Sequence, residues 1–386
     1  MKILLISMVG IAACSSPVGG PAGPDHGPPV GCQAQGGGST AMPAGAPVLP
    51  VGVWTNISPA ALDWGNGPFT QGITLDPCHA GTLYLSVCAF DVSLKNPGVY
   101  KSVDGGSTWA RVGQLDEPIH IRVNPKDPQH LVAVDGVRGG TEGFQVSHDG
   151  GMSWVSPAGF LALKDQLFQY DTYDVAVDPA DFNHALVTSH SGWNGWNKPY
   201  NDAWMGDSGI LETKDGGDTW TLRGPLPGWS HGNGVWFLGN SNTWLLGSQA
   251  NGFWRTSDGG ATFTQVVKDN YMQHGGGGIY RSASGVIYAG GTPHLMRSAD
   301  DGVTWDSTLG PSSGYNAVIG DGTTLYTAPV FGPRMLTAPE ADGATWTDYP
   351  AAPSLSSGPF EFAYDSANNI IYAGMWGEGL WALRVK

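Results

Sequence analysis

The stretch Ser102-Val103-Asp104-Gly105-Gly106-Ser107-Thr108-Trp109 decides the fold of this chain, because the chain repeats it. The repeated pattern is Ser/Thr-x-Asp-x-Gly-x-Thr/Ser-aromatic. Further copies span residues 147–154, 213–220, 256–263 and 298–305, and a degenerate sixth copy keeps only Gly343, Thr345 and Trp346. Alternating apolar runs flank the copies, and alternation around a glycine-rich polar turn is typical of a β-hairpin.

Each position of the repeat suits a tight turn. The aspartate can accept hydrogen bonds from turn N–H groups, the glycines tolerate positive φ, and the closing aromatic ring can pack between neighbouring sheets. A catalytic role for these aspartates would require a separate site in every copy. We therefore predict that they are structural, at Asp104, Asp149, Asp215, Asp258 and Asp300.

The spacing of the repeats indicates the architecture. Successive copies are about 45, 66, 43, 42 and 41 residues apart, and a period near 40–50 residues with several strands per unit is the signature of a β-propeller. The 66-residue step indicates an insertion of roughly 20 residues in the third unit.

The number of units predicts a closed ring. Seven strand-rich units follow residue 51, and the last has neither a repeat turn nor a fourth strand. A lone apolar segment, residues 51–57, precedes the first unit and resembles the strands that follow the turns. We predict an all-β, seven-bladed β-propeller over residues 51–386, read as a single domain and closed by this N-terminal strand in the last blade, which removes exposed sheet edges.

The N-terminus has the features of an export signal. Residues 1–13 combine one lysine, a short apolar run and small residues. Ile11-Ala12-Ala13-Cys14 resembles the bacterial lipobox, which implies cleavage before Cys14 and lipidation of its thiol. Residues 14–50, dominated by Gly, Pro, Ala and Ser, are predicted to be a flexible tether. We expect an exported protein, lipid-anchored to the cell envelope (to the outer membrane in a Gram-negative cell); an ordinary secretory signal is the alternative.

The remaining cysteines allow at most one disulfide. Cys78 and Cys88 lie at opposite ends of one predicted strand, roughly 30 Å apart, and should not pair with each other. Cys32 could pair with either. No metal-ligand spacing is present, and no cofactor is expected.

The repeat resembles the Asp-box of sialidase-type, sortilin-type and xyloglucan-hydrolase β-propellers. In that superfamily the boxes occupy one rim and ligands bind on the opposite face. The resemblance therefore directs attention to loops leading into each inner strand and loops joining second to third strands. Those loops carry Trp64, Asp116, Glu117, Arg138, Tyr170, Asp171, Trp229, His231, His274, Trp376 and Glu378.

The insertion in the third unit is the most informative loop. It places Trp193, Trp196 and Trp204 among Asn, Gly and Asp residues. Aromatic rings beside short polar side chains suit the C–H faces and hydroxyls of sugars; a self-packed loop is the structural alternative. His231 and His274, each followed by glycine, suit either ligand contact or hydrogen bonds to the loop backbone.

Charge narrows the choice of partner. The net charge is −15, which disfavours nucleic acid and anionic membrane surfaces. We expect a polysaccharide or oligosaccharide ligand, membrane contact only through the lipid, no nucleic acid, and a monomer.

Two enzyme families share the repeat. Sialidases hold their substrate with three arginines, one in an Arg-Ile-Pro motif that this chain lacks. The segment Gly67-Pro68-Phe69-Thr70-Gln71-Gly72-Ile73, continued by residues 84–91 and 98–101, resembles glycoside hydrolase family 74, the xyloglucan hydrolases. This resemblance covers about 35 residues closely and places Asp91 near the family's catalytic aspartate.

The second catalytic carboxylate of that family lies on a second propeller, which this chain does not have. Asp171, Asp174 or Glu378 could take its place. The leading interpretation is a glycoside hydrolase with Asp91 as general base or nucleophile. The alternatives are a non-enzymatic propeller that binds glycans or proteins, as in sortilin-type receptors and a photosystem assembly factor, and a polysaccharide lyase using His231, His274 and Tyr170.

Overall fold

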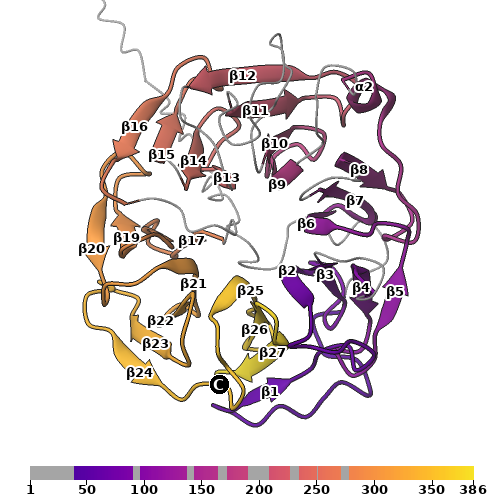
Figure 1. Cartoon of the computed structure of the whole chain (residues 1–386), viewed down its shortest axis with the longest axis vertical. Helices are drawn as coiled ribbons and strands as arrows, with labels where there is room; N and C mark the ends of the chain where they lie inside the picture. The colour runs from indigo at the N-terminus through magenta and orange to yellow at the C-terminus, as the bar shows by residue number, and fades with distance from the viewer. Residues whose placement is uncertain are drawn as a thin grey trace, which may run out of the picture.

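In the computed structural model, the described residues are 39–89, 96–136, 143–163, 172–189, 208–226, 234–249, 251–270 and 278–386. Their strands form six four-stranded antiparallel sheets and one three-stranded sheet, arranged as blades around a ring (Figure 1). The predicted all-β, seven-bladed propeller is confirmed. No helix in the described ranges is long and apolar enough to cross a membrane.

The blades follow the chain in order around the ring. Blade one contains β2 (Pro68–Leu75), β3 (Leu83–Ala89), β4 (Gly98–Ser102) and β5 (Ala110–Val112). Blade two contains β6 (Pro118–Asn124), β7 (Asp127–Asp135) and β8 (Gly143–Ser147). Blade three contains β9 (Thr172–Val177), β10 (Ala185–Ser189), β11 (Ser208–Thr213) and β12 (Thr221–Leu226). Blade four contains β13 (Gly234–Phe237), β14 (Trp244–Ser248), β15 (Gly252–Thr256) and β16 (Thr264–Val267).

The later blades repeat this plan. Blade five contains β17 (Tyr280–Arg281), β18 (Ile287–Ala289), β19 (Leu295–Ser298) and β20 (Asp306–Leu309). Blade six contains β21 (Tyr315–Gly320), β22 (Thr324–Pro329), β23 (Met335–Pro339) and β24 (Thr347–Tyr349). Blade seven contains β25 (Pro359–Asp365), β26 (Ile370–Met375) and β27 (Gly379–Arg384), completed by β1 (Trp54–Asn56).

Strand β1 closes the ring as predicted. Trp54 pairs with Leu383 and Asn56 with Trp381, in antiparallel register. Figure 1 shows the N-terminal β1 beside the C-terminal β27. The indole of Trp54 is buried in the core of blades five to seven, so the closing strand is held by side-chain packing as well as by backbone hydrogen bonds.

Blade two departs from the four-stranded plan. Val155 makes an isolated antiparallel bridge with Val146, through two 2.9 Å backbone hydrogen bonds, where the other blades have a fourth strand. The chain then enters the short helix α2 (Ala158–Leu161). Phe160 of this helix packs edge-on against Trp220 of blade three, so the helix fills space between the two blades.

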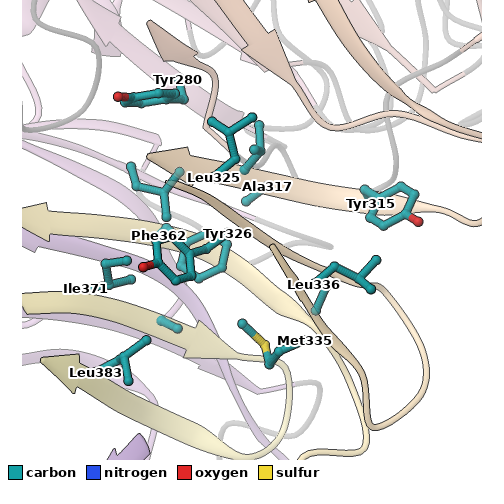
Figure 2. Close-up of a cluster of buried hydrophobic side chains, with 14 of the residues drawn as sticks. Tyr280, Tyr315, Ala317, Leu325, Tyr326, Met335, Leu336, Phe362, Ile371 and Leu383 are labelled. Atoms are coloured by element: carbon teal, nitrogen blue, oxygen red, sulfur yellow. The ribbon is translucent and has the colours of Figure 1, made fainter. Parts of the chain in front are cut away.

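Apolar cores lie between neighbouring sheets. The largest cluster among the described residues joins blades five, six and seven, and Figure 2 shows its side chains coming from several strands. Tyr315, Leu325, Met335 and Ile371 are among its fully buried members. Burial on both faces explains why strands such as β26, the second strand of blade seven, consist almost wholly of apolar residues.

Residues 39–50 differ from the predicted tether. Ser39 accepts a 2.8 Å hydrogen bond from the N–H of Ala80, Met42 packs on the core of blades seven and one, and Leu49 is buried. Apolar anchors and backbone bonds therefore hold this part of the segment on the ring. The remainder of the predicted signal and tether, Cys14 included, lies outside the described residues.

The two described cysteines do not pair with each other, as expected. Cys78 is disulfide-bonded. The buried sulfur of Cys88 lies 2.9 Å from Nε2 of Gln71. The pairing of Cys32 stays a prediction.

Candidate functional site

The repeat turns form one face of the ring, which we call the turn face. In the first copy, Asp104 accepts hydrogen bonds from the Thr108 N–H at 2.8 Å, the Thr108 hydroxyl at 2.6 Å and the Ser102 hydroxyl at 2.8 Å. Gly105 and Gly106 have φ of 71° and 92°, which L side chains rarely adopt. The indole of Trp109 donates to the Ile57 carbonyl at 2.7 Å, so the turn also ties blade one to the closing segment.

The same bonds recur at Asp149, Asp215, Asp258 and Asp300. Hydrogen bonds from Ser153 and Ser147 lower the pKa of Asp149 to about 2. A carboxylate that is ionised at neutral pH and already accepts three hydrogen bonds is a poor proton donor or acceptor. This geometry supports the predicted structural role.

The opposite face is the end where the inner strands begin, at Pro68, Pro118, Thr172, Gly234, Tyr280, Tyr315 and Pro359. Many predicted site residues lie outside the described residues: Asp91, Arg138, Tyr170, Asp171, Trp193, Trp196, Trp204, Trp229, His231 and His274. The described ones are Trp64, Asp174, Trp376 and Glu378.

Asp174 lies on inner strand β9 and is fully buried. Its Oδ1 is 2.8 Å from Nδ1 of His120 and 3.4 Å from Nη2 of Arg122, and its Oδ2 accepts the N–H of Val235 at 3.0 Å. Burial opposes ionisation, but His120 and Arg122 outweigh it and hold the pKa of Asp174 below its usual value. This environment favours a structural role over the predicted catalytic one, because no raised pKa would supply a proton near neutral pH.

The contacts of Asp174 and its partner Arg122 extend further across the ring. Nη1 of Arg122 is 3.6 Å from Oε1 of Glu361, and Oε2 of Glu361 accepts the N–H of Ile73 at 2.9 Å. We call His120, Arg122, Asp174 and Glu361 the inner-strand cluster. Its contacts connect the inner strands of blades seven, one, two, three and four.

Glu378 and Trp64 also have structural partners. Oε1 of Glu378 accepts the N–H of Ser356 at 2.6 Å and contacts the hydroxyl of the same serine. Nε1 of Trp64 donates to the Pro59 carbonyl at 3.3 Å, and its ring packs on the core of blades seven and one. Glu378 fixes the loop before β25, and Trp64 fixes the loop before β2.

Trp376 belongs to an aromatic stack on the opposite face. Its ring lies 4.3 Å from that of Phe69, at 25°, and 4.9 Å from that of Phe360, at 28°. Phe69 begins blade one and Phe360 begins blade seven, so the stack bridges the junction where the ring closes. Sequence analysis placed Trp376 among the candidate ligand-binding residues of this face but did not select its two phenylalanine partners.

A carboxyl pair lies beside this junction. Glu117 immediately precedes β6, Asp135 ends β7, and both side chains are buried, with 7% and 0% of each residue exposed. The N–H of Ala89, the last residue of β3, lies 3.4 and 3.3 Å from the two carboxyl oxygens of Glu117. The N–H of Asp116 donates to Oδ2 of Asp135 at 3.2 Å.

This environment keeps Glu117 protonated. Burial raises the pKa of Glu117 to about 8; the Ala89 N–H opposes this rise, and the charges of Asp135 and Asp116 add to it. A protonated carboxylic acid beside a second carboxyl group is the arrangement that glycosidases use for proton donation. Sequence reasoning placed Glu117 on this face but did not select it, because the burial that raises its pKa comes from blades one and two together.

Two hollows lie on the turn face instead. One of about 400 Å³ is lined by Asp76, Thr82 and Tyr364 between blades one and seven, and one of about 530 Å³ by His130, His148 and Asp218 between blades two and three. Neither contains the carboxyl pair. Among the described residues no group of three or more His, Cys, Asp or Glu side chains could hold a metal ion.

The chain forms a seven-bladed β-propeller with a buried carboxyl pair and an aromatic stack on one face, and comparisons with known proteins give the same fold. No protein-family model matches the chain. A xyloglucanase from a Paenibacillus species is 28% identical over 194 residues, covering 36% of this chain and 19% of the relative. A xyloglucanase from Acetivibrio thermocellus is 26% identical over 200 residues, covering 42% and 23%. The chain thus spans about a fifth of the length of these curated relatives.

Solved structures share the fold at low identity. The GH74 xyloglucanase from Xanthomonas campestris superposes on 86% of this chain and 53% of its own length, with a TM-score of 0.57 and 18% identity. YCF48 from Cyanidioschyzon merolae covers 86% of this chain and 98% of its own length, with a TM-score of 0.55 and 13% identity. A YCF48 structure bound to a D1 peptide gives a TM-score of 0.56.

Proposed function

We propose that this protein is an exported Asp-box propeller that acts on polysaccharide as a glycoside hydrolase of the xyloglucanase type. The observation that carries the proposal is the buried Glu117–Asp135 carboxyl pair on the opposite face. Support comes from the position of Glu117 against Ala89, where β3 ends in the segment that resembles the xyloglucan hydrolases. The low, partial identity to xyloglucanases points to the same substrate class.

In this proposal Glu117 is the general acid. Its protonated carboxyl group donates to the glycosidic oxygen as the bond to the sugar breaks. Burial, with a smaller contribution from the charge of Asp135, keeps it protonated before the reaction. The second role, base or nucleophile, falls to the predicted Asp91. The proposal includes export with a lipid on Cys14, through which the propeller is held at the cell envelope.

The test is a screen of the purified protein against plant and bacterial polysaccharides, with release of reducing ends as the readout. We expect Glu117→Gln to lower cleavage by about 10²- to 10⁴-fold, and wild-type activity to fall as pH rises through about 8. Asp63→Asn is the matched control, because Asp63 lies exposed in a loop of the same face. Cleavage at the wild-type rate by Glu117→Gln contradicts the assignment of the acid.

A protein-binding platform is the second candidate. It is favoured by the single ring, which matches nearly the whole length of YCF48, a propeller solved with a bound peptide. Absence of cleavage across the screen, together with capture of a peptide or protein ligand by the opposite face, would decide for this candidate. Where cleavage is found, Asp91→Asn is expected to abolish it, and cleavage that survives this substitution unchanged would show that the Asp91 assignment is wrong.

A further inference from the structure

Two histidines of blade two lie side by side on the turn face. Leu131 of β7 pairs with Ser147 of β8, and the same antiparallel register places His130 directly opposite His148. Their ring centroids are 4.5 Å apart and their planes are tilted by 31°. Residues opposite each other on antiparallel strands have Cβ atoms about 4.5–5.5 Å apart, and two imidazoles at this spacing can bind one metal ion together.

The two rings are close to the geometry of a shared ion. Imidazole nitrogens bind Zn²⁺ at about 2.0–2.1 Å, so two of them on one tetrahedral ion are about 3.3 Å apart. Small rotations about the side-chain bonds bring the two rings to this separation. His148 is exposed and free to rotate, whereas Phe182 of blade three packs edge-on against His130, with ring centroids 4.8 Å apart. One ligand is therefore held in place, and the other can adjust to the ion.

The surroundings of the pair attract cations. Both histidines line the hollow of about 530 Å³ between blades two and three, together with Asp149, Asp215 and Asp218. Asp149 and Asp215 use their carboxylates in the repeat turns, so they supply negative charge rather than ligand atoms. A hollow lined by negative charge concentrates cations, and imidazole suits Zn²⁺, Cu²⁺ and Ni²⁺. The hollow therefore favours a divalent transition metal ion.

The pair also lies in the blade that departs from the four-stranded plan. Val155, whose bridge to Val146 stands where the other blades have a fourth strand, lines the same hollow. Beyond the histidines, the two strands are joined by the Gly150 N–H to Gln129 carbonyl bond at 3.0 Å. An ion held by one histidine from each side of this hairpin would cross-link a blade that has only a short bridge at its outer edge.

We propose that His130 and His148 form a binding site for a divalent transition metal ion of the Zn²⁺ type, and that the bound ion cross-links β7 to the turn that follows β8. Water molecules fill the remaining coordination positions, because the described residues contain no group of three or more side chains that could hold a metal ion. The site is independent of the proposed hydrolase activity, since it lies on the turn face and the carboxyl pair lies on the opposite face.

The test of the site is a calorimetric titration of ZnCl₂ into the protein, prepared without a histidine tag and freed of metal by dialysis. Wild type is compared with His130→Ala, His148→Ala and His79→Ala. His79 is the matched control, because it is an exposed histidine of the turn face whose Nδ1 lies 2.9 Å from Oδ2 of Asp76. We expect one Zn²⁺ per chain in wild type and His79→Ala. Removal of either paired histidine should weaken binding by about 100-fold, because the remaining ligand then acts alone.

Hydrogen exchange followed by mass spectrometry tests the cross-link. At ten times its dissociation constant, Zn²⁺ should slow exchange in peptides from β7 and β8 of wild type by about 10-fold, and leave His148→Ala unchanged. His148→Ala keeps the test valid even if His130→Ala unfolds, since the His148 side chain is exposed.

Two results would overturn the site: wild type that binds no Zn²⁺, or His148→Ala that binds it as tightly as wild type. Loss of binding in His79→Ala alone would likewise place the ion elsewhere. Binding that depends on both paired histidines but gives no protection of β7 and β8 overturns the cross-link and leaves the site.

Discussion

At the scale of the residue, the ionisation of carboxyl groups in this protein depends on three different kinds of surroundings. The turn carboxylates are ionised because hydroxyl and N–H donors surround them, as at Asp149. Asp174 is ionised because His120 and Arg122 are its neighbours. Glu117 is protonated because it is buried near other carboxylates. Surroundings rather than residue type assign the structural and chemical roles.

The raised pKa of Glu117 predicts how stability depends on pH. The ordinary value is 4.5 and the folded value is about 8, so between these values the folded protein binds a proton that the unfolded chain has released. Stability contributed by Glu117 therefore falls as pH rises from about 5 to about 8. Chemical unfolding of wild type and Glu117→Gln across this range should show a flatter pH dependence in the variant.

Asp63→Asn serves as the control for that measurement. It should reproduce the wild-type slope, because the exposed Asp63 makes only a local bond to Asn66 among its described contacts. Parallel curves for wild type and Glu117→Gln would show that Glu117 has an ordinary pKa.

At the scale of the element, strand β2 packs closely against blade two and against the carboxyl group of Glu361. A methyl group on Gly72 would lie 2.8 Å from the Ile119 carbonyl oxygen and 2.9 Å from Oε2 of Glu361. Both distances are shorter than van der Waals contact. The glycine lets β2 approach blade two and lets Glu361 reach the N–H of Ile73.

Gly72→Ala should therefore destabilise the protein by about 1–3 kcal/mol, the cost of overpacking a filled interior. The measurement is the urea midpoint of unfolding, with fluorescence of the tryptophans as the signal. Glu361→Gln separates the two causes: it removes the charge but leaves the packing of β2. An unchanged midpoint for Gly72→Ala would mean that the inner strands move apart without cost.

At the scale of the whole molecule, closure of the ring depends on β1. This strand has only three residues, but Trp54 is 5% exposed and reaches the core of the last blades. Ile57, just after the strand, donates its N–H to the Leu380 carbonyl at 3.0 Å. Strands β1 and β27 thus meet in one sheet, so we expect the loss of either strand to open the ring.

Trp54→Ala is expected to lower the free energy of unfolding by roughly 3–5 kcal/mol, as for other large-to-small changes in a core. Thermal unfolding followed by circular dichroism measures the effect. Val53→Ala is the control, since Val53 is adjacent in sequence but 52% exposed. If both variants unfold at the wild-type temperature, the closing strand contributes little to the ring.

The fold was predictable from the sequence because it is repeated locally. Each turn contains its own hydrogen-bonding partners within eight residues, as at Ser102, Asp104 and Thr108, so the pattern appears without knowledge of distant contacts. The spacing of the turns then predicted the length of each blade. The lone apolar segment before blade one predicted that an N-terminal strand closes the ring. Blade two's missing fourth strand was not foreseen, because Val155 and α2 occupy its place through contacts with blade three.

The site was only partly predictable, since its residues come from different blades. Sequence alone determined the repeat and the ring, and its resemblance to Asp-box propellers directed the search for a site to the face opposite the turns. Only the tertiary structure decided that Glu117 is buried beside Asp135, that Asp174 is paired with His120 and Arg122, and that Phe69 and Phe360 stack on Trp376. The physical reason is that the hydrogen bonds of each turn join residues that are close in sequence. Burial and electrostatic coupling, by contrast, arise only when blades distant in sequence pack together.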